Sequence, residues 1–158
     1  MEKIAVFPGT FDPFTVGHES ITKRALSLFD KVVIAVGKNL SKKTLFSLEQ
    51  RLAMVNDVFA NDTRIEVQSY EGLTVEFCHN IGAKFLIRGL RTSADFEYER
   101  AIAQVNKIMN HDIETVFLLT SPEHTPINSS IVRDILINKG DATIFLPEAI
   151  NIQKYINH

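Results

Sequence analysis

Apolar residues follow two alternating patterns along this chain of 158 residues. Short continuous runs of aliphatic residues, typical of strands covered on both faces of a sheet, are separated by longer stretches in which apolar positions return every three or four residues. The short runs predict five strands, at Ile4–Phe7, Val32–Val36, Ile65–Val67, Phe85–Ile87 and Val116–Leu119.

The stretches between these runs have the period of amphipathic helices. Ile21, Ala25 and Leu28 share one face of the first stretch, and Ser47 with Gln50 forms a capping-box pattern at the start of the second. Further helices are predicted at 75–81, after a cap at Ser93, after a cap within Asn128-Ser129-Ser130, and from Pro147 onward. We expect the longest of them to face the core with the stripe formed by Tyr98, Ala101, Ile102, Val105, Ile108 and Met109.

Strands and helices alternate, with no repeat and no Pro/Ser-rich linker between them. This order predicts an α/β fold, a doubly wound five-stranded parallel sheet with helices on both faces, in a single domain over residues 1–158. In such sheets ligands bind beyond the carboxyl ends of the strands, near the point where the strand order reverses. The residues that directly follow each strand are therefore the candidates for function.

The first of these connections, Gly9 to His18, reads GTFDPFTVGH and is longer than most connections between a strand and a helix. Gly9 and Gly17 allow the backbone to approach a ligand closely, and Thr10 offers a hydroxyl group. His18 falls in the first helical turn, where free N–H groups and the helix dipole favour an anion. Taken singly, these residues are more often those of an ordinary turn.

Three other strand ends carry cationic or polar residues. Lys42 lies in the loop after the second strand, Arg88-Gly89-Leu90-Arg91 follows the fourth, and Asn128-Ser129-Ser130 follows the fifth at a helix start. Guanidinium groups match phosphate in geometry, and helix N-termini bind anions. Each segment alone also fits a plain interpretation, such as arginines paired with nearby acids or ordinary capping. Their coincidence at one edge of the sheet favours a phosphate ligand.

Composition narrows the class of ligand. The chain has 17 Lys and Arg against 19 Asp and Glu, a net charge of −2, so we expect no nucleic acid as a partner. Cys78 is the one cysteine, which excludes an intrachain disulfide, and no apolar stretch approaches the roughly 20 residues of a membrane span. The first apolar run is too short for a secretory signal. We expect a cytoplasmic protein that does not bind membranes and holds a small anion in a local cationic cluster.

Two segments resemble the signatures of the nucleotidyltransferase superfamily. Gly9–Pro13 with Thr15-Val16-Gly17-His18 is similar to its [HT]-x-G-H signature, and Ile127–Ser130 is similar to its I-S-S-[ST] signature. Within the superfamily the chain resembles the bacterial phosphopantetheine adenylyltransferases nearly end to end. The more specific matches are Ser41-Lys42-Lys43, Arg88-Gly89-Leu90-Arg91, Ala94-Asp95-Phe96-Glu97-Tyr98-Glu99 and Phe145-Leu146-Pro147-Glu148.

This resemblance implies a Rossmann-like nucleotidyltransferase fold and a reversible transfer of AMP from ATP to 4′-phosphopantetheine. The products would be dephospho-coenzyme A and pyrophosphate, in the penultimate step of coenzyme A synthesis, by direct in-line attack without a covalent enzyme intermediate. It further implies Mg²⁺ as cofactor, held mainly by the ATP phosphates with no protein side chain as a metal ligand. The family also implies a homohexamer.

Carried over by position, the resemblance gives each matched residue a role. His18, Thr10, Lys42 and Arg91 would be catalytic. The residues that bind 4′-phosphopantetheine would be Thr10, Lys42, Thr74 and Arg88. The residues that bind ATP would be Thr10, Phe11, His18, Gly89, Leu90, Arg91, Glu99, His124, Thr125, Pro126, Ile127, Asn128, Ser129 and Ser130. Three positions depart from the usual pattern: Asn128 replaces a serine, His124 replaces a larger aromatic residue, and Thr74 replaces an aliphatic one.

Three other functions compete with this one. A related nucleotidyltransferase could act on nicotinate mononucleotide or on a cytidylyl acceptor, but the RGLR block and Lys42 argue against it. A silent nucleotide sensor would be expected to lose His18, Lys42 or Arg88, and all three are present. A nucleic-acid-binding module conflicts with the net charge and with the lack of interleaved aromatic residues.

Overall fold

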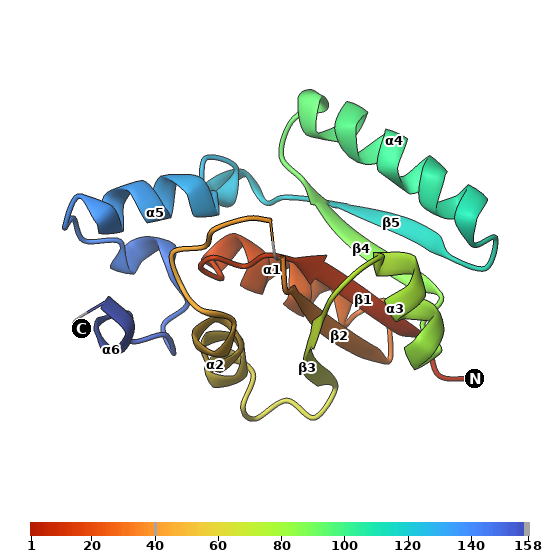
Figure 1. Ribbon diagram of the computed structural model, residues 1–158, viewed down its shortest axis with the longest axis horizontal. Coiled ribbons are helices and arrows are strands. Elements are labelled where there is room, and N and C mark those ends of the chain that lie inside the picture. Colours follow the sequence, from red (N-terminus) through yellow and green to blue (C-terminus); the bar gives the residue numbers. More distant parts are fainter. Residues whose placement is uncertain (40, 157–158) are drawn as a thin grey trace.

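The computed structural model describes residues 1–39 and 41–156, which form a five-stranded sheet covered by helices (Figure 1). The strands are parallel and lie in the order β3-β2-β1-β4-β5. Their bounds are β1 Ile4–Gly9, β2 Lys31–Gly37, β3 Ile65–Tyr70, β4 Phe85–Leu90 and β5 Glu114–Leu119. All five predicted strands are confirmed. Each is longer than its apolar run, because pairing continues into polar end residues such as Arg88, which lies opposite Phe117.

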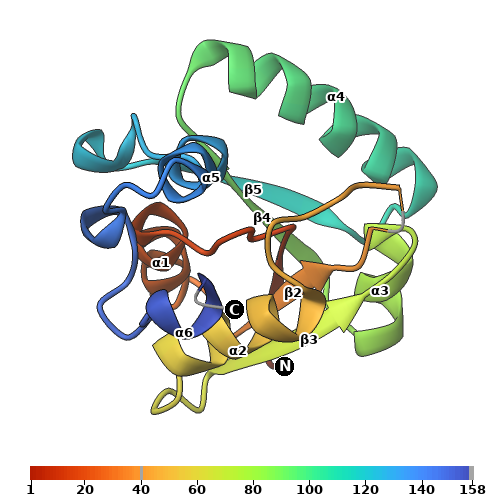
Figure 2. The same ribbon diagram turned by 60° about the vertical axis from the view of Figure 1, so that its left-hand side comes forward.

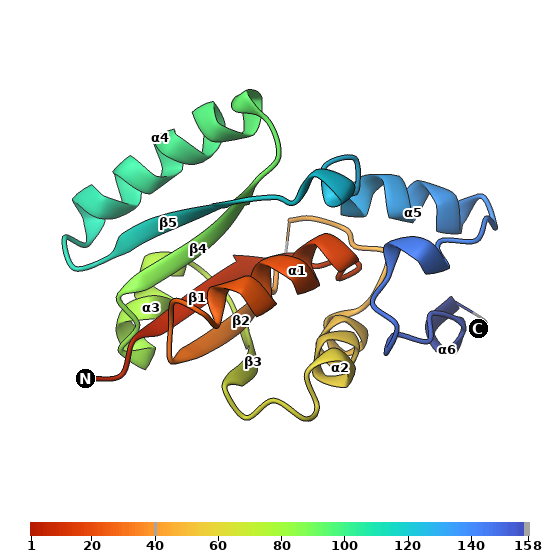
Figure 3. The ribbon, with the colours of Figure 1, turned by 180° about the vertical axis from the view of Figure 1, so that it is seen from behind.

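The helices lie on both faces of the sheet, as predicted (Figures 1 and 3). Ala5 and Phe7 of β1 belong to the core under α1 and α2, whereas Val6 belongs to a second core under α3. The helices are α1 Val16–Ala25, α2 Leu48–Val58, α3 Thr74–Ile81, α4 Ser93–Met109, α5 Ser129–Ile137 and α6 Gln153–Ile156. Two 3₁₀ turns complete the set, η1 Pro122–His124 and η2 Thr143–Phe145.

The strand order reverses between β1 and β4. The chain passes from β1 outward to β2 and β3, then returns to place β4 on the other side of β1. The connections that leave β1 and β4 therefore diverge and open a crevice beyond the carboxyl ends of these strands. Helix α5 lies beyond this edge of the sheet, and the C-terminal segment folds back beside α2 (Figure 2).

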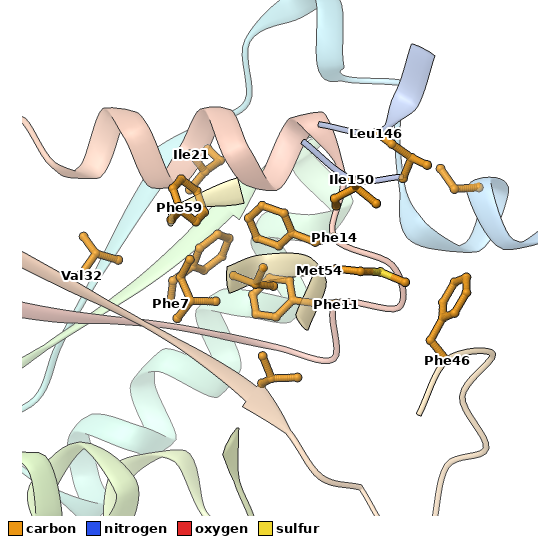
Figure 4. Packing of buried hydrophobic residues seen from close by; sticks show 14 of the residues in the cluster. Phe7, Phe11, Phe14, Ile21, Val32, Phe46, Met54, Phe59, Leu146 and Ile150 are labelled. Carbon is orange, nitrogen blue, oxygen red and sulfur yellow. The ribbon is translucent and has the colours of Figure 1, made fainter. Parts of the chain in front are cut away.

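The connection after β1 is anchored in the larger core. Figure 4 shows Phe7, Phe11 and Phe14 close together beside α1. The ring of Phe11 lies 5.3 Å from the ring of Phe7 and 5.3 Å from that of Phe14, and Phe14 also packs against Phe59 at 5.9 Å. Phe14 is 0% exposed and Phe11 is 4% exposed. Buried aromatic rings thus hold a segment whose polar residues face the crevice.

Helix α4 corrects one expectation. Its apolar stripe does not face the core of this chain: no residue of α4 is buried, and Tyr98 and Ile108 are 70% and 72% exposed. The helix instead rests against the sheet edge through contacts such as that between Phe96 and Phe117, whose rings lie 5.8 Å apart. The helical period of these apolar residues predicted an apolar stripe on α4, but it could not show whether the core of the same chain buries that stripe.

Two smaller expectations about helix starts are also wrong. Thr92 rather than Ser93 caps α4, because its side chain accepts the N–H of Asp95. Pro147 does not begin the last helix, which is the short α6 at Gln153–Ile156. The cap predicted at Ser47 is confirmed, and of the three candidates at positions 128–130 Asn128 caps α5. None of the helices in the described residues is both long and apolar enough to cross a membrane.

Candidate active site

Two adjoining cavities open at the carboxyl ends of the strands. The larger, of about 770 Å³, lies between the ends of β2 and β3 and helix α4; the smaller, of about 310 Å³, lies between the starts of α1 and α5. Both cavities are lined by Pro8, Gly9, Thr10 and Arg88. Their shared wall therefore lies at the ends of β1 and β4, where the strand order reverses.

Most of the site residues expected from the sequence meet at these cavities. The smaller cavity is lined by Thr10, Phe11, His18, Lys42, Arg88, Gly89, Arg91, His124, Ile127, Asn128, Ser129 and Ser130. Thr74 and Glu99 line the larger cavity, together with Thr10 and Arg88. Three expected ATP contacts line neither cavity: Leu90, Thr125 and Pro126.

The smaller cavity is strongly cationic for a chain of net charge −2. Lys42, Arg88, Arg91 and Arg133 line it, and the one carboxylate in that lining is Asp12. Both oxygens of this carboxylate already accept backbone N–H groups, from Leu45 and Phe46. The structure thus contains a local cationic cluster of the kind expected from the net charge for binding a small anion.

His18 is held in one orientation by a reciprocal cap of α1. The Nδ1 atom of His18 accepts the backbone N–H of Thr15 at 3.0 Å, and the hydroxyl oxygen of Thr15 accepts the backbone N–H of His18 at 3.4 Å. Because Nδ1 serves as an acceptor, the proton of a neutral ring resides on Nε2. The cap therefore leaves Nε2–H as the donor of this ring.

The surroundings of His18 keep the ring neutral. Burial, and then the positive charges of Arg88 and Arg91, lower its pKa from 6.5 to about 4. Phe11 meets the ring edge-on at 4.9 Å, and Phe14 lies 5.3 Å away. At neutral pH the His18 ring is therefore neutral, and its Nε2–H can donate a hydrogen bond.

Arg88, in the last half of β4, and Arg91, just after it, both pair with nearby acids, which confirms one of the two interpretations of their sequence. Arg88 forms a bidentate pair with Glu99, at 2.8 and 2.7 Å, and donates to the carbonyl oxygen of Pro8 at 2.9 Å. These bonds use three of its five N–H groups and orient the guanidinium at the shared wall. Arg91 lies 3.5 Å from Asp95, whose carboxylate also accepts the backbone N–H of Arg91.

The start of α5 closes the smaller cavity. The Asn128 side chain accepts the N–H of Ile131 at 2.9 Å, so asparagine caps this helix as serine would. The hydroxyl of Ser129 donates to the carbonyl oxygen of Pro13, and Arg133 donates to that of Asp12. These bonds tie the helix start to the connection after β1.

Sequence reasoning missed several residues of the larger cavity. Ile102 and Asn106 line it from α4, three and seven positions after Glu99, and this helical spacing was a usable signal. Tyr70 lines it as well, and its hydroxyl lies 3.0 Å from the hydroxyl of Thr74. That partner makes the polar Thr74 compatible with a position where an aliphatic residue is usual.

The neutral state of His18 is directly testable. We expect the ¹⁵N shifts of its ring to report the Nε2–H tautomer without titration between about pH 5.5 and 8 in the ligand-free protein. Since unfolding restores the pKa to 6.5, the stabilisation from the neutral ring is complete above 6.5 and is lost as pH falls toward about 4. Titration of this ring near pH 6.5 would contradict the assignment.

Comparison with known proteins agrees with this geometry. The sequence profile described as cytidylyltransferase-like matches residues 6–135. A phosphopantetheine adenylyltransferase from Flavobacterium psychrophilum is 48% identical over 149 residues, covering 94% of this chain and 98% of the relative. One from Cytophaga hutchinsonii is 50% identical over 150 residues, covering 95% and 100%.

Solved structures show the same fold at lower identity. A bifunctional NMN adenylyltransferase/ADP ribose pyrophosphatase from Francisella tularensis matches with a TM-score of 0.71 and 19% identity over 98% of this chain and 47% of its own. Its complex with AMP and Mn ion matches with a TM-score of 0.69 and 17% identity over 99% and 48%. This chain spans about half of that protein, and at such identity the likeness shows the fold alone. The full-length relatives at 48% and 50% identity decide the family: the chain belongs to the phosphopantetheine adenylyltransferases.

Proposed function

We propose that this chain transfers AMP from ATP to 4′-phosphopantetheine at the wall shared by the two cavities. The observation that carries the proposal is that the cavities adjoin and share Thr10 and Arg88. A transfer between two bound substrates requires both to lie side by side with their reacting groups at one place. One cavity is cationic and the other mixes polar with apolar lining, so they suit two different substrates.

The smaller cavity would take ATP and the larger would take the arm of 4′-phosphopantetheine. Lys42, Arg91 and the start of α5 offer charge and backbone N–H groups to a triphosphate. Tyr70, Thr74 and Asn106 offer polar contacts to an arm of amide groups and methylenes, beside the apolar Ile102. The acceptor phosphate then lies at the shared wall, beside Arg88.

The reaction follows from this placement. An oxygen of the acceptor phosphate attacks the α-phosphorus of ATP, a new P–O bond forms, and the bond to pyrophosphate breaks on the opposite side. The Nε2–H of His18 and the hydroxyl of Thr10 would donate to the α-phosphate oxygens as negative charge accumulates on them. Lys42 and Arg91 would supply positive charge on either side. No nucleophile of the protein is required.

Mg²⁺ would enter as part of the ATP substrate. The described residues contain no group of three or more His, Cys, Asp and Glu able to hold a metal ion, and the Asp12 carboxylate accepts two N–H groups. The phosphate oxygens of ATP are therefore the ligands we propose for the ion.

We also propose that residues 1–158 act as one domain in the cytoplasm.

We further propose that the chain forms a homohexamer in which a second copy covers the apolar stripe of α4. Val105 is 53% exposed and Ile108 is 72% exposed on this helix. A stripe at helical period that remains uncovered in one chain is typical of an interface between chains.

The choice of acceptor tests the function. Pyrophosphate release from ATP should be rapid with 4′-phosphopantetheine and negligible with nicotinate mononucleotide or with pantetheine that lacks the phosphate. Arg88→Ala should raise the KM for 4′-phosphopantetheine about 10-fold to 100-fold, because hydrogen bonds to charged groups are worth roughly 1.5–3 kcal/mol. Arg100→Ala, which removes an exposed arginine paired with Glu97, is the control and should leave KM unchanged. Equal use of unphosphorylated pantetheine would refute the phosphate site.

His18→Ala tests the proposed donor to the α-phosphate. We expect kcat to fall by about 10²–10³, the usual cost of one lost transition-state donor, while the KM for ATP changes less than about threefold. Steady-state kinetics with varied ATP measures both. A raised KM with a nearly normal kcat would assign His18 to binding instead.

The hexamer can be tested on α4. Val105→Glu and Ile108→Glu should dissociate the assembly, because an interface would bury the new charge without a partner, whereas the fold should tolerate residues that are exposed in the single chain. Light scattering measures the mass and circular dichroism the fold. Leu28→Glu, at a site that is 52% exposed next to α1, is the control. A wild-type protein of monomeric mass would disprove the proposal.

A further inference from the structure

Asp12 is a buried carboxylate that holds the end of the Lys42 loop. It is 2% exposed, and its two oxygens accept the backbone N–H groups of Leu45 and Phe46, each at 2.9 Å. These two residues lie three and four positions after Lys42. The connection after β1 thereby fixes the connection after β2 from one side.

Arg51 is a buried guanidinium that holds the same two connections from the other side. It is 3% exposed and lies in the first turns of α2. It donates to the carbonyl oxygens of Thr10 at 2.7 Å, Gly37 at 3.0 Å and Phe46 at 3.2 Å. One side chain therefore joins the end of β2, Thr10 and the end of the loop that carries Lys42.

The hydrogen bonds of Asp12 and Arg51 stabilise the junction of the two connections and also fix its geometry. Burial lowers the pKa of the Arg51 guanidinium, because the charged form loses hydration, and the negative charge of Asp12 opposes this shift. Apolar residues of similar volume would leave two N–H groups and three carbonyl oxygens without these partners, at a cost in stability. They would also not supply the set of directed bonds that meets at Phe46, where Asp12 takes the N–H and Arg51 takes the carbonyl.

We propose that Asp12 and Arg51 are positioning residues that set Lys42 relative to Thr10 and so act on the transfer through Lys42. The inference rests on the proposed function, in which Lys42 contacts phosphate. Lys42 lines the smaller cavity and its neighbour Ser41 lines the larger, so the loop borders both. A shift of about 1 Å in a positioning group can cost on the order of 10²-fold in rate.

A double-mutant cycle with Lys42→Ala tests this link. Asp12→Asn removes the charge and one of the two acceptors, and Arg51→Lys keeps the charge but cannot reach three carbonyl groups at once. Each should lower kcat/KM for 4′-phosphopantetheine by about tenfold or more per folded molecule in the wild-type background. In the Lys42→Ala background the same changes should cost less than about twofold.

The control and the outcomes separate positioning from folding. Asp62→Asn makes the same substitution at a more exposed carboxylate, which bonds the backbone N–H of Arg64 at 3.0 Å outside both cavities, and should leave kcat/KM unchanged. Equal losses with and without Lys42 would overturn the positioning role, as would failure of both Asp12→Asn and Arg51→Lys to fold. If Lys42→Ala alone has normal kinetics, the proposed role of Lys42 fails. If Lys42→Ala is impaired and the second substitutions cost as much as in the wild type, only the positioning role of Asp12 and Arg51 fails. The two failures are therefore distinguishable.

Discussion

The burial of Phe11 and Phe14 is the constraint on which the site depends. Both rings belong to the connection after β1, and their packing under α1 holds the polar residues between and around them at the edge of the sheet. Phe11 even adopts a left-handed backbone conformation, with φ of 51°, which a bulky residue rarely takes without tertiary support. The connection between β1 and α1, which spans only residues 10–15 in the structure, can thus present Thr10 and, in the first turn of α1, His18 in a defined geometry.

This packing explains why the two glycines that flank the connection have different structural roles. A Cβ on Gly9 would lie 2.8 Å from Cζ of Phe11, so Gly9 is needed first for the aromatic ring that packs against it. A Cβ on Gly17 would meet only the Thr15 hydroxyl at 3.5 Å and the Cβ of His124 at 3.9 Å, both ordinary contacts. Gly17 lines the smaller cavity, and packing within the chain does not require a glycine there as it does at position 9.

The sequence predicted the features that follow from hydrophobic periodicity, from capping residues and from the shared carboxyl edge of parallel strands. Five strands, the cap at Ser47, a cap within positions 128–130, and the gathering of His18 with Arg88 and Arg91 all follow from those rules. Arg51 escaped prediction because its three acceptors come from segments that only the fold brings together. The exposure of Ile108 also escaped prediction, because apolar periodicity marks a stripe on a helix without showing whether the core of the same chain covers it.

The departures from the family pattern fall at the outer walls of the cavities, where the structure accommodates them. Asn128 still caps α5, and Thr74 has the hydroxyl of Tyr70 as a partner. His124 is the exception: its buried Nδ1 lacks a hydrogen-bond partner among the described residues. The shared wall tolerates no such freedom, because Arg88 serves two cavities and also lowers the pKa of His18. In the proposed reaction, a substitution of Arg88 would alter acceptor binding and raise the pKa of His18, the proposed donor, whereas one at an outer wall would alter the fit of a single substrate.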